Sequence, residues 1–402
     1  STLVTGYDIL FFWVARMMFM SMEFMHEVPF RHVFIHGLVR DSQGRKMSKS
    51  LGNGIDPLEV IDKYGADALR FTLVTGNTPG NDMRFYYEKV EGNRNFANKL
   101  WNATKFTIMN LDDYEESFVP DTADLTLADR WILDRLNRTI EDVSRNLDKF
   151  ELGAAADNIY NFAWNYFCDW YIEMTKEKLN NGTEAEKADT KNILGYVLDQ
   201  TLKLMHPIMP FVTEALWPDM PHEGKSIMIA DYPVVHDEFA DEKSEEQMKR
   251  LIELITAVRN IRNEANAPMS KPVDLLIKTD DQAAADMLLA NADYIKRFCH
   301  PADLQIATDT QAPKLAMSGI VTGAEVYIPM AELVDLKEEH ARMEKEIAKL
   351  EKEVQRSEKK LGNEKFVNNA PEAVVAEERA KAVEWKQKLE AAQARLASLQ
   401  NA

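Results

Sequence analysis

The sequence predicts a mainly α-helical protein that begins with the end of an α/β domain, and three patterns support this prediction. Apolar residues recur three and four positions apart, as on one face of a helix, through the ranges 88–109, 126–149, 152–179 and 185–205. Residues 1–75 instead mix helix-like and strand-like runs, which is typical of an α/β domain. After residue 331 a heptad pattern takes over.

The α/β part begins with an apolar, helix-like run over 9–25. A strand-like run follows over 32–39, and a second helix is predicted from Pro57, because proline suits the first turn of a helix. Between them lies a polar loop, 41–53, which contains two glycines. The loop is therefore expected to connect the end of a strand to the start of a helix.

The four helical ranges predict a helical bundle. The segment 206–210 should close it, because its two prolines interrupt a helix. Beyond it a helix is predicted over 245–265, followed by a small α+β domain with a further helix over 283–298. Alternating apolar residues predict the strands of that domain at 272–278, 304–307, 316–321 and 325–329.

Two heptad seams are predicted near the end of the sequence. They consist of Leu336, His340, Met343, Ile347, Leu350, Val354 and Leu361, and of Ala382, Trp385, Leu389, Ala392, Leu396 and Leu399. Glycine, asparagine and proline within 362–371 break the pattern, so the two helices should fold back as an antiparallel coiled-coil hairpin. A hairpin of balanced charge often serves only as a solvated arm or a partner helix.

The composition indicates a soluble chain with several packed cores. With 402 residues, 45% of them hydrophobic, about two to four domains are expected. The sequence contains no apolar run of about 18 residues, so we expect neither a membrane span nor a membrane partner. It starts in mid-pattern and without methionine, and we expect a piece of a longer protein.

The two cysteines, Cys168 and Cys299, lie far apart and form no C-x-x-C pair. This spacing argues against a disulfide framework and against a zinc site, so we predict no zinc and no metal ligands. The same cysteine usage fits a reducing compartment, the cytoplasm. Nothing in the sequence demands a dimer, and we expect a monomer.

The formal net charge of −18 would on average repel nucleic acid. This average hides a basic stretch, because residues 40–105 contain eleven Lys or Arg against eight Asp or Glu. Phosphate contacts depend on local charge, so the acidic total does not exclude an RNA partner.

The loop contains the hexapeptide Arg-Lys-Met-Ser-Lys-Ser at 45–50. Lys46 and Lys49 place two ammonium groups three residues apart, with the hydroxyl of Ser48 between them. A mobile cationic loop of this kind can close over a polyphosphate and stabilise the charge on a departing pyrophosphate. Most loops of lysine and serine are only solvated surface, and short motifs often match by chance. From these residues alone both interpretations stay open.

The longer stretch of sequence around this hexapeptide resembles the second signature region of class I aminoacyl-tRNA synthetases. The matching segments are His36–Val39, Lys46–Asn53, Asp56–Pro57 and Tyr64–Arg70. The resemblance implies that this region binds ATP, accompanied by Mg²⁺, and that Lys46 and Lys49 are catalytic. The ATP-binding residues that it implies here are His36, Gly37, Lys46, Met47, Ser48, Lys49 and Ser50.

Upstream, Val4–Trp13 resembles the valyl version of the strand-to-helix turn that holds the aminoacyl adenylate in this family. Gly6 would let the backbone approach the nucleotide, and Asp8 could accept hydrogen bonds from ribose hydroxyls. Ile9 and Trp13 would offer apolar walls for the valine side chain. Without the resemblance, Ile9 and Trp13 read as ordinary core residues of an amphipathic helix.

The segment that starts at Arg94 resembles the family's helix that leads into the anticodon-binding bundle. Lys99 could meet a phosphate there, Asn102 a base edge, and Phe106 an unpaired base, with Lys105 as a further cation. In the alternative interpretation Phe106 is buried and Lys99 is solvated, and periodicity does not choose between the two.

The resemblance covers essentially the whole sequence, and 363–371 resembles the tip of the arm that lies along tRNA in the valyl type. It implies four parts: the end of a Rossmann-like catalytic domain (1–75), a stem-contact and helical anticodon-binding domain (76–235), a small α+β domain (236–331) and a coiled-coil tRNA-binding arm (332–402).

The resemblance implies a parent protein that activates valine with ATP and transfers it to tRNA(Val). The family's first signature, His-x-Gly-His, does not occur in this sequence, so the chain alone is expected to be inactive. Two alternatives stay open. One is a non-catalytic RNA-binding or scaffold protein derived from a synthetase, and the other is an isoleucyl or leucyl relative.

Overall fold

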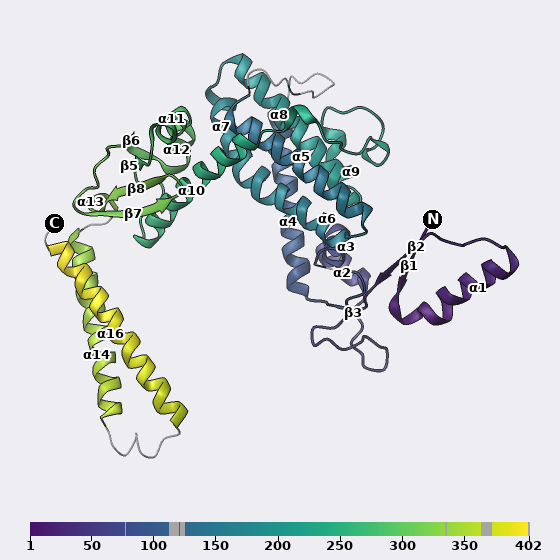
Figure 1. The fold of residues 1–402 in the computed structure, drawn as a ribbon, viewed down its shortest axis with the longest axis horizontal. Coiled ribbons are helices and arrows are strands. Elements are labelled where there is room, and N and C mark those ends of the chain that lie inside the picture. Colours follow the sequence, from purple (N-terminus) through teal and green to yellow (C-terminus); the bar gives the residue numbers. More distant parts are fainter. Residues whose placement is uncertain (77, 112–119, 121–124, 334–335, 363–371, 401–402) are drawn as a thin grey trace. The chain divides into compact units, whose positions relative to one another are not determined.

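The fold is given by a computed structural model (Figure 1), which describes residues 1–76, 78–111, 120, 125–333, 336–362 and 372–400. The chain divides into two compact units, Ser1–Glu246 and Gln247–Ala402. Both units are rich in helices and contain small sheets. In the parts of the chain that the structure describes, no helix combines the length and apolarity needed to cross a membrane.

The first unit opens with two parallel strands joined by a helical connection. Strands β1 (Thr2–Gly6) and β2 (His32–His36) pair so that Gly6 lies opposite His36. The connection consists of a 3-10 turn η1 (Tyr7–Ile9), a π-helical turn η2 (Leu10–Val14) and helix α1 (Ala15–Phe24). The helix predicted over 9–25 is therefore a composite, because apolar periodicity does not distinguish α-helical from π-helical turns.

The strand predicted over 32–39 is two strands in two different sheets, which corrects the sequence interpretation. β2 ends at His36, whereas β3 (Val39–Arg40) pairs in parallel with β4 (Met83–Arg84). Gly37 lies between them, and a Cβ built on it would lie 1.8 Å from the carbonyl oxygen of Asn81. A residue without a side chain is required where the two backbones approach this closely.

The predicted helix from Pro57 is also divided. Helix α2 (Pro57–Tyr64) is capped by the side chain of Asp56 and ends at Gly65, whose φ is 91°. Helix α3 (Ala66–Val74) follows directly. Buried side chains of both helices form one apolar core with Phe85, so α2 and α3 give the polar loop a rigid base.

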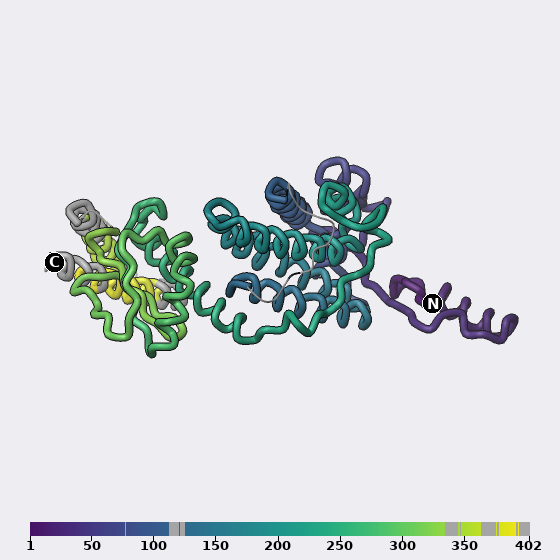
Figure 2. The backbone as a smooth tube through the Cα atoms, turned by 90° about the horizontal axis from the view of Figure 1, so that it is seen from above, coloured from purple at the N-terminus to yellow at the C-terminus, as the bar shows by residue number. Residues whose placement is uncertain are grey.

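A helical bundle makes up most of the first unit, and its helices lie side by side in Figure 1 and in the view from above in Figure 2. Its elements are α4 (Tyr87–Met109), α5 (Leu127–Asp148), α6 (Leu152–Asn161), η3 (Phe162–Tyr171), α7 (Ile172–Asn181), α8 (Glu184–Met205) and α9 (Pro210–Leu216). Thr126 and Thr183 form capping boxes that start α5 and α8. The bundle predicted from the sequence is therefore confirmed in outline.

One predicted helix of the bundle, over 152–179, is three segments, because its middle part η3 has π-helical turns. Aromatic rings pack where this part begins: Tyr160 of α6 and Trp164 of η3 stack with 5.7 Å between their centroids. Phe96 of α4 packs on Tyr160 at 4.7 Å. This packing joins segments that are distant in sequence, so the local apolar pattern could not reveal the change of helix type.

Two side chains of α3 hold the start of α9. The Asp67 carboxylate accepts hydrogen bonds from the N–H groups of Phe211 (3.3 Å) and Val212 (2.6 Å), which lie in the first turn of α9. Arg70 donates its Nε–H to the carbonyl of Ile208 at 2.9 Å. The loop-bearing part and the end of the bundle are thus joined by specific polar contacts.

After α9 the chain makes three short 3-10 turns, η4 (Trp217–Asp219), η5 (Ile227–Ile229) and η6 (Asp237–Phe239). Helix α10 (Glu242–Glu264) then leads into the second unit. Its bounds confirm the helix predicted over 245–265.

The second unit contains a four-stranded sheet in the order β6–β5–β8–β7. Its strands are β5 (Val273–Thr279), β6 (Pro301–Ala307), β7 (Ala316–Val321) and β8 (Ala324–Pro329), and only the β5–β6 pair is parallel. All four predicted strands are confirmed. The helix predicted over 283–298 is divided at Asn291 into α11 (Gln282–Ala290) and α12 (Ala292–Cys299), and a short helix α13 (Met330–Leu333) follows the sheet.

Two long helices, α14 (Leu336–Leu361) and α16 (Glu372–Gln400), pack against each other in antiparallel directions. Ion pairs link Lys360 to Glu378 (2.8 Å) and Glu358 to Lys386 (2.7 Å). Leu350 and Val354 of the first predicted seam are buried, as are Val375 and Ala382 on α16. The predicted tip, 363–371, lies outside the described residues.

Candidate functional site

The polar loop and the turn after β1 come together in the structure, although 38 residues separate their contact points in sequence. The Lys46 ammonium lies 3.4 Å from Oδ2 of Asp8. Lys46 also forms an isolated antiparallel bridge to Arg40, which keeps the start of the loop beside β3. The first loop lysine is thereby placed over the carboxyl end of β1.

The carboxyl ends of β1 and β2 supply the neighbouring residues. Gly6 and His36 are paired in the register, and a Cβ on Gly6 would lie 2.8 Å from Oδ1 of Asp8. The exposed His36 ring places Nδ1 2.8 Å from the carbonyl oxygen of Gly37. Since ligands of parallel α/β sheets bind beyond the carboxyl ends of the strands, Gly6, Asp8, His36, Gly37 and Lys46 gather at the expected edge.

Inside the loop, hydrogen bonds between nearby residues fix the backbone. The N–H of Ser48 donates to Oδ1 of Asn53 at 2.9 Å, and the hydroxyl groups of Ser48 and Ser50 lie 3.1 Å apart. Met47 is half-buried against the apolar core of α2 and α3. Lys49 and Ser50 are exposed, so the second loop lysine points into solvent from an ordered backbone.

Asp82, which the sequence interpretation did not single out, connects three parts of this region. Its carboxylate accepts from the N–H of Leu38 (2.7 Å), from the hydroxyl of Tyr7 (3.1 Å) and from the guanidinium of Arg40. The hydrogen bond from Leu38, followed by that from Arg40, lowers the pKa of Asp82. Asp82 lies beyond the predicted loop, so the local pattern gave no signal for it.

This arrangement can bind a polyphosphate. The Lys46 side chain is 63% exposed and Lys49 is exposed, so both ammonium groups can move toward phosphate oxygens. In the described part of the chain, no group of three or more His, Cys, Asp or Glu could hold a metal ion. A Mg²⁺ ion that accompanies ATP needs few protein ligands, because phosphates and water supply most of its coordination.

Ile9 and Trp13, the predicted valine-pocket residues, follow β1 and are 43% and 56% exposed. Other large apolar side chains of the same connection are also exposed; they include Phe11, Phe12, Phe19, Met22, Phe24 and Met25. A contiguous exposed apolar surface of this kind usually contacts another polypeptide surface or a ligand.

The predicted tRNA-contact residues lie on α4, in two environments. Lys99 is bonded to the Asp169 carboxylate and lies 3.7 Å from the centroid of the Trp164 ring. Lys105 pairs with Asp219 at 2.9 Å.

The other three of these residues differ in exposure. Arg94 is half-buried, pairs with Glu91 at 3.3 Å and lies over the ring of Tyr64. Asn102 is exposed, whereas Phe106 is half-buried below the Lys176 ammonium. The structure therefore leaves Asn102 most available and holds the lysines in ion pairs.

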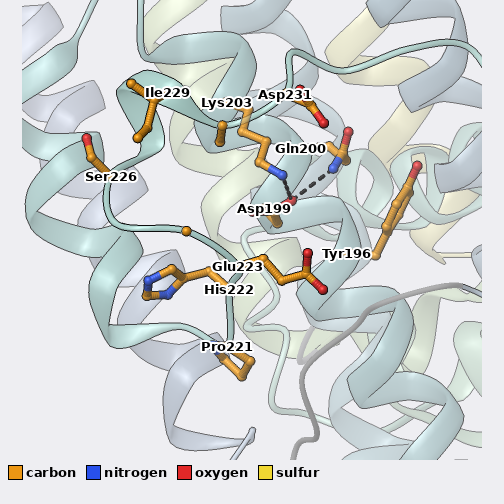
Figure 3. Close-up of a pocket in the computed structure, with 12 residues that line it drawn as sticks. Tyr196, Asp199, Gln200, Lys203, Pro221, His222, Glu223, Ser226, Ile229 and Asp231 are labelled. Carbon is orange, nitrogen blue, oxygen red and sulfur yellow. Dashed lines mark hydrogen bonds and ion pairs between the residues drawn. The ribbon is translucent and has the colours of Figure 1, made fainter.

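A separate cavity of about 500 Å³ lies between α8 and the segment 221–231 (Figure 3). Lys203 and Gln200 point toward the Asp199 carboxylate and donate to it at 2.8 and 2.9 Å. The indole N–H of Trp217 donates to the other oxygen of Asp199 at 2.8 Å. These internal bonds account for the polar groups around Asp199, and we assign no ligand to the cavity.

Three parts of the chain match models of known protein families. Residues 1–86 match the family described as tRNA synthetases class I (I, L, M and V). Residues 129–277 match the anticodon-binding domain of tRNA ligase, and residues 335–400 match the valyl tRNA synthetase tRNA binding arm. The alternative of an isoleucyl or leucyl relative is not favoured by the last match.

Curated relatives and one solved structure extend the comparison. The chain is 55% identical to the valine–tRNA ligase of Enterococcus faecalis and 58% identical to that of Lactiplantibacillus plantarum. These matches cover 100% and 99% of the chain but only 46% and 45% of the relatives, so the chain spans less than half of their length. A LeuRS–tRNA–LeuAMS complex from Agrobacterium radiobacter K84 shares the fold over 60% of this chain and 29% of its own, with a TM-score of 0.51 and 20% identity. The chain therefore belongs to the valine–tRNA ligase family of class I tRNA synthetases.

Proposed function

We propose that this chain acts as part of a longer valine–tRNA ligase, in which it supplies the second ATP signature loop and surfaces that bind tRNA. The longer protein would join valine to ATP, release pyrophosphate and pass valine to tRNA(Val). The observation that carries this proposal is the 3.4 Å contact between Lys46 and Asp8. It joins the two segments that resemble the family's nucleotide-binding parts at one edge of a parallel sheet.

The roles of the loop residues follow from their charge and exposure. Lys49 is exposed on a backbone that internal hydrogen bonds fix, so its ammonium can reach phosphate oxygens without reordering the chain. Lys46, held near Asp8, would neutralise charge on the same polyphosphate. Gly6, His36, Gly37, Met47, Ser48 and Ser50 would form the remaining surface for ATP, with Mg²⁺ bound mainly through the phosphates.

Ile9 and Trp13 would line the pocket for the valine side chain once another part of the protein covers this surface. Their exposure of 43% and 56%, together with the exposed apolar residues of η2 and α1, supports a partner surface that the chain itself does not supply. For the same reason we expect the chain alone to be catalytically inactive. We propose that the ATP site is completed by a part of the longer protein that corresponds to the rest of the relatives' length.

We propose two tRNA-binding surfaces. On α4, Arg94, Lys99, Asn102, Lys105 and Phe106 would contact RNA, with the lysines exchanging carboxylate partners for phosphates. The antiparallel pair α14 and α16 would serve as the tRNA-binding arm, which the family match over 335–400 supports. We expect a monomeric cytoplasmic protein with no membrane partner and no zinc.

The division into four domains also belongs to this proposal. The end of a Rossmann-like domain would cover 1–75, the anticodon-binding part 76–235, the small α+β domain 236–331 and the arm 332–402. The four-stranded sheet within the second unit supports the third of these parts.

A charging assay tests the proposal. The longer protein that carries this chain, supplied with ATP, should charge tRNA(Val) with valine and should discriminate against isoleucine and leucine by at least about tenfold. Lys49→Ala should slow charging strongly, whereas Lys278→Ala, an exposed change on β5, should not. Equal charging with isoleucine, or an unaffected Lys49→Ala variant, would contradict the proposal.

A further inference from the structure

The loop that carries Lys46 and Lys49 is held together at its base by one carboxylate. Asp41 is 7% exposed, and its Oδ1 accepts from the N–H groups of Gln43 (3.1 Å) and Arg45 (2.8 Å). Its Oδ2 accepts from Nε of Arg45 (2.7 Å) and from the amide Nδ2 of Asn53 (2.9 Å). Each carboxylate oxygen therefore has two donors.

Asn53 extends this contact across the loop. Its Oδ1 accepts from the N–H of Ser48 at 2.9 Å, and its Nδ2 also lies 3.3 Å from the carbonyl oxygen of Lys46. A single amide side chain thus bonds to the backbone on both sides of Met47 while it donates to Asp41. The hydrogen bond from Asn53 is also the largest cause of the lowered pKa of Asp41.

We propose that Asp41 and Asn53 form one positioning unit, the Asp41–Asn53 tie, that sets the backbone of the signature loop so that Lys46 and Lys49 face the departing pyrophosphate. This inference rests on the proposed function, because it assigns a purpose to the geometry of that loop. Neither residue touches the nucleotide in this account. Both act by fixing the loop, and a small displacement of a catalytic group is enough to slow a reaction.

The chemistry of the tie predicts specific variants. In Asp41→Asn the new amide faces two N–H donors with its NH₂ group in either orientation. One pair of the four hydrogen bonds is therefore lost, although the size of the side chain is kept. In Asn53→Asp two carboxylates face each other. The double variant Asp41→Asn/Asn53→Asp again pairs a donor with an acceptor across the same contact.

The test compares these variants in the longer protein by valine-dependent ATP–pyrophosphate exchange, with tRNA affinity as the check on folding. Asp41→Asn and Asn53→Asp should each lower kcat by about tenfold or more and change KM for valine by less than about twofold. The double variant should recover at least about threefold over Asn53→Asp, because residues in direct contact are not independent. Asp56→Asn is the matched control, since asparagine caps α2 as well as aspartate does.

Trypsin supplies a second readout that does not need activity, because Arg45, Lys46 and Lys49 lie in the loop itself. Cleavage of this chain after these residues should be faster in Asp41→Asn and unchanged in Asp56→Asn. Wild-type kcat and wild-type cleavage in Asp41→Asn, or a double variant no better than Asn53→Asp, would overturn the inference. A wild-type protein without exchange activity would instead contradict the proposed function, and the cleavage rates would still decide whether the tie exists.

Discussion

The ammonium group of Lys46 lies 3.4 Å from the carboxylate of Asp8, so the loop after β3 reaches the turn after β1. In the sequence these segments are only two matches to family patterns. In the fold they meet at one edge of the proposed nucleotide-binding surface, because β1 and β2 are parallel and end together.

Gly37 should tolerate no side chain. A Cβ at this position would lie 1.8 Å from the carbonyl oxygen of Asn81, so Gly37→Ala must push apart β2 and the segment before β4. We expect a loss of at least about 2 kcal/mol in the free energy of unfolding, measured with urea. Gly54→Ala, where no atom lies within 4 Å of the added Cβ, should change it by less than about 1 kcal/mol. Equal effects of the two changes would show that the close approach at Gly37 is wrong.

Asp67 should hold the start of α9. Asp67→Ala leaves the N–H groups of Phe211 and Val212 without this acceptor, which we expect to cost about 1–3 kcal/mol and several degrees in Tm. Thermal unfolding followed by circular dichroism measures the change. Asp62→Ala, an exposed change on α2, is the control and should leave Tm within about 1 °C.

The lowered pKa of His206 predicts that the folded chain loses stability in mildly acidic solution. Burial lowers the pKa of His206, although Glu214 and Asp67 act in the opposite direction, and its Nδ1 lies 2.7 Å from the Thr213 hydroxyl. The unfolded chain therefore takes up this proton at a higher pH than the folded one, and stability falls as pH drops below about 6.5. Urea midpoints at pH 7.5 and 5.5 should differ less in His206→Gln than in the wild-type chain. An identical pH dependence of both proteins would rule out His206 as its source.

Binding of tRNA should depend on α4. For this chain, the logarithm of the affinity for tRNA(Val) should fall linearly with the logarithm of the salt concentration. Lys105→Ala should weaken binding and reduce that slope by about one, because one phosphate contact is lost. Lys243→Ala, an exposed change on α10, serves as the control. A slope unchanged by Lys105→Ala would remove this residue from the tRNA surface.

The sequence predicted the fold most accurately where each element has its own local pattern. Strand β7 has the predicted bounds 316–321, and the bundle helices start and end near the predicted residues. The predictions failed where a contact distant in sequence decides the local form. Examples are the division at Gly37, which Asn81 imposes, and the π-helical turns of η3, which pack on α4.

The candidate site shows the same limit. The loop lysines, Gly6 and Asp8 could be found because they belong to short patterns that resemble a family. Asp82 could not be assigned a role, because its hydrogen bond with Tyr7 spans 75 residues. The roles proposed for Asp41 and Asn53 rest on a hydrogen bond across the loop that no residue pattern indicates. The ion pairs of Lys99 and Lys105 with Asp169 and Asp219 were equally invisible to helical periodicity.

We expect the loop lysines to act in the activation step and not in tRNA binding. The most direct test of this expectation measures valine-dependent ATP–pyrophosphate exchange by the longer protein, with Lys46→Ala and Lys49→Ala beside the wild type, and tRNA(Val) affinity in parallel. Each change should lower kcat by about 100-fold or more, because a group that stabilises developing charge is removed, while tRNA affinity should stay within about twofold. Unchanged exchange in both variants, or a loss of tRNA affinity that accounts for the whole effect, would contradict this expectation.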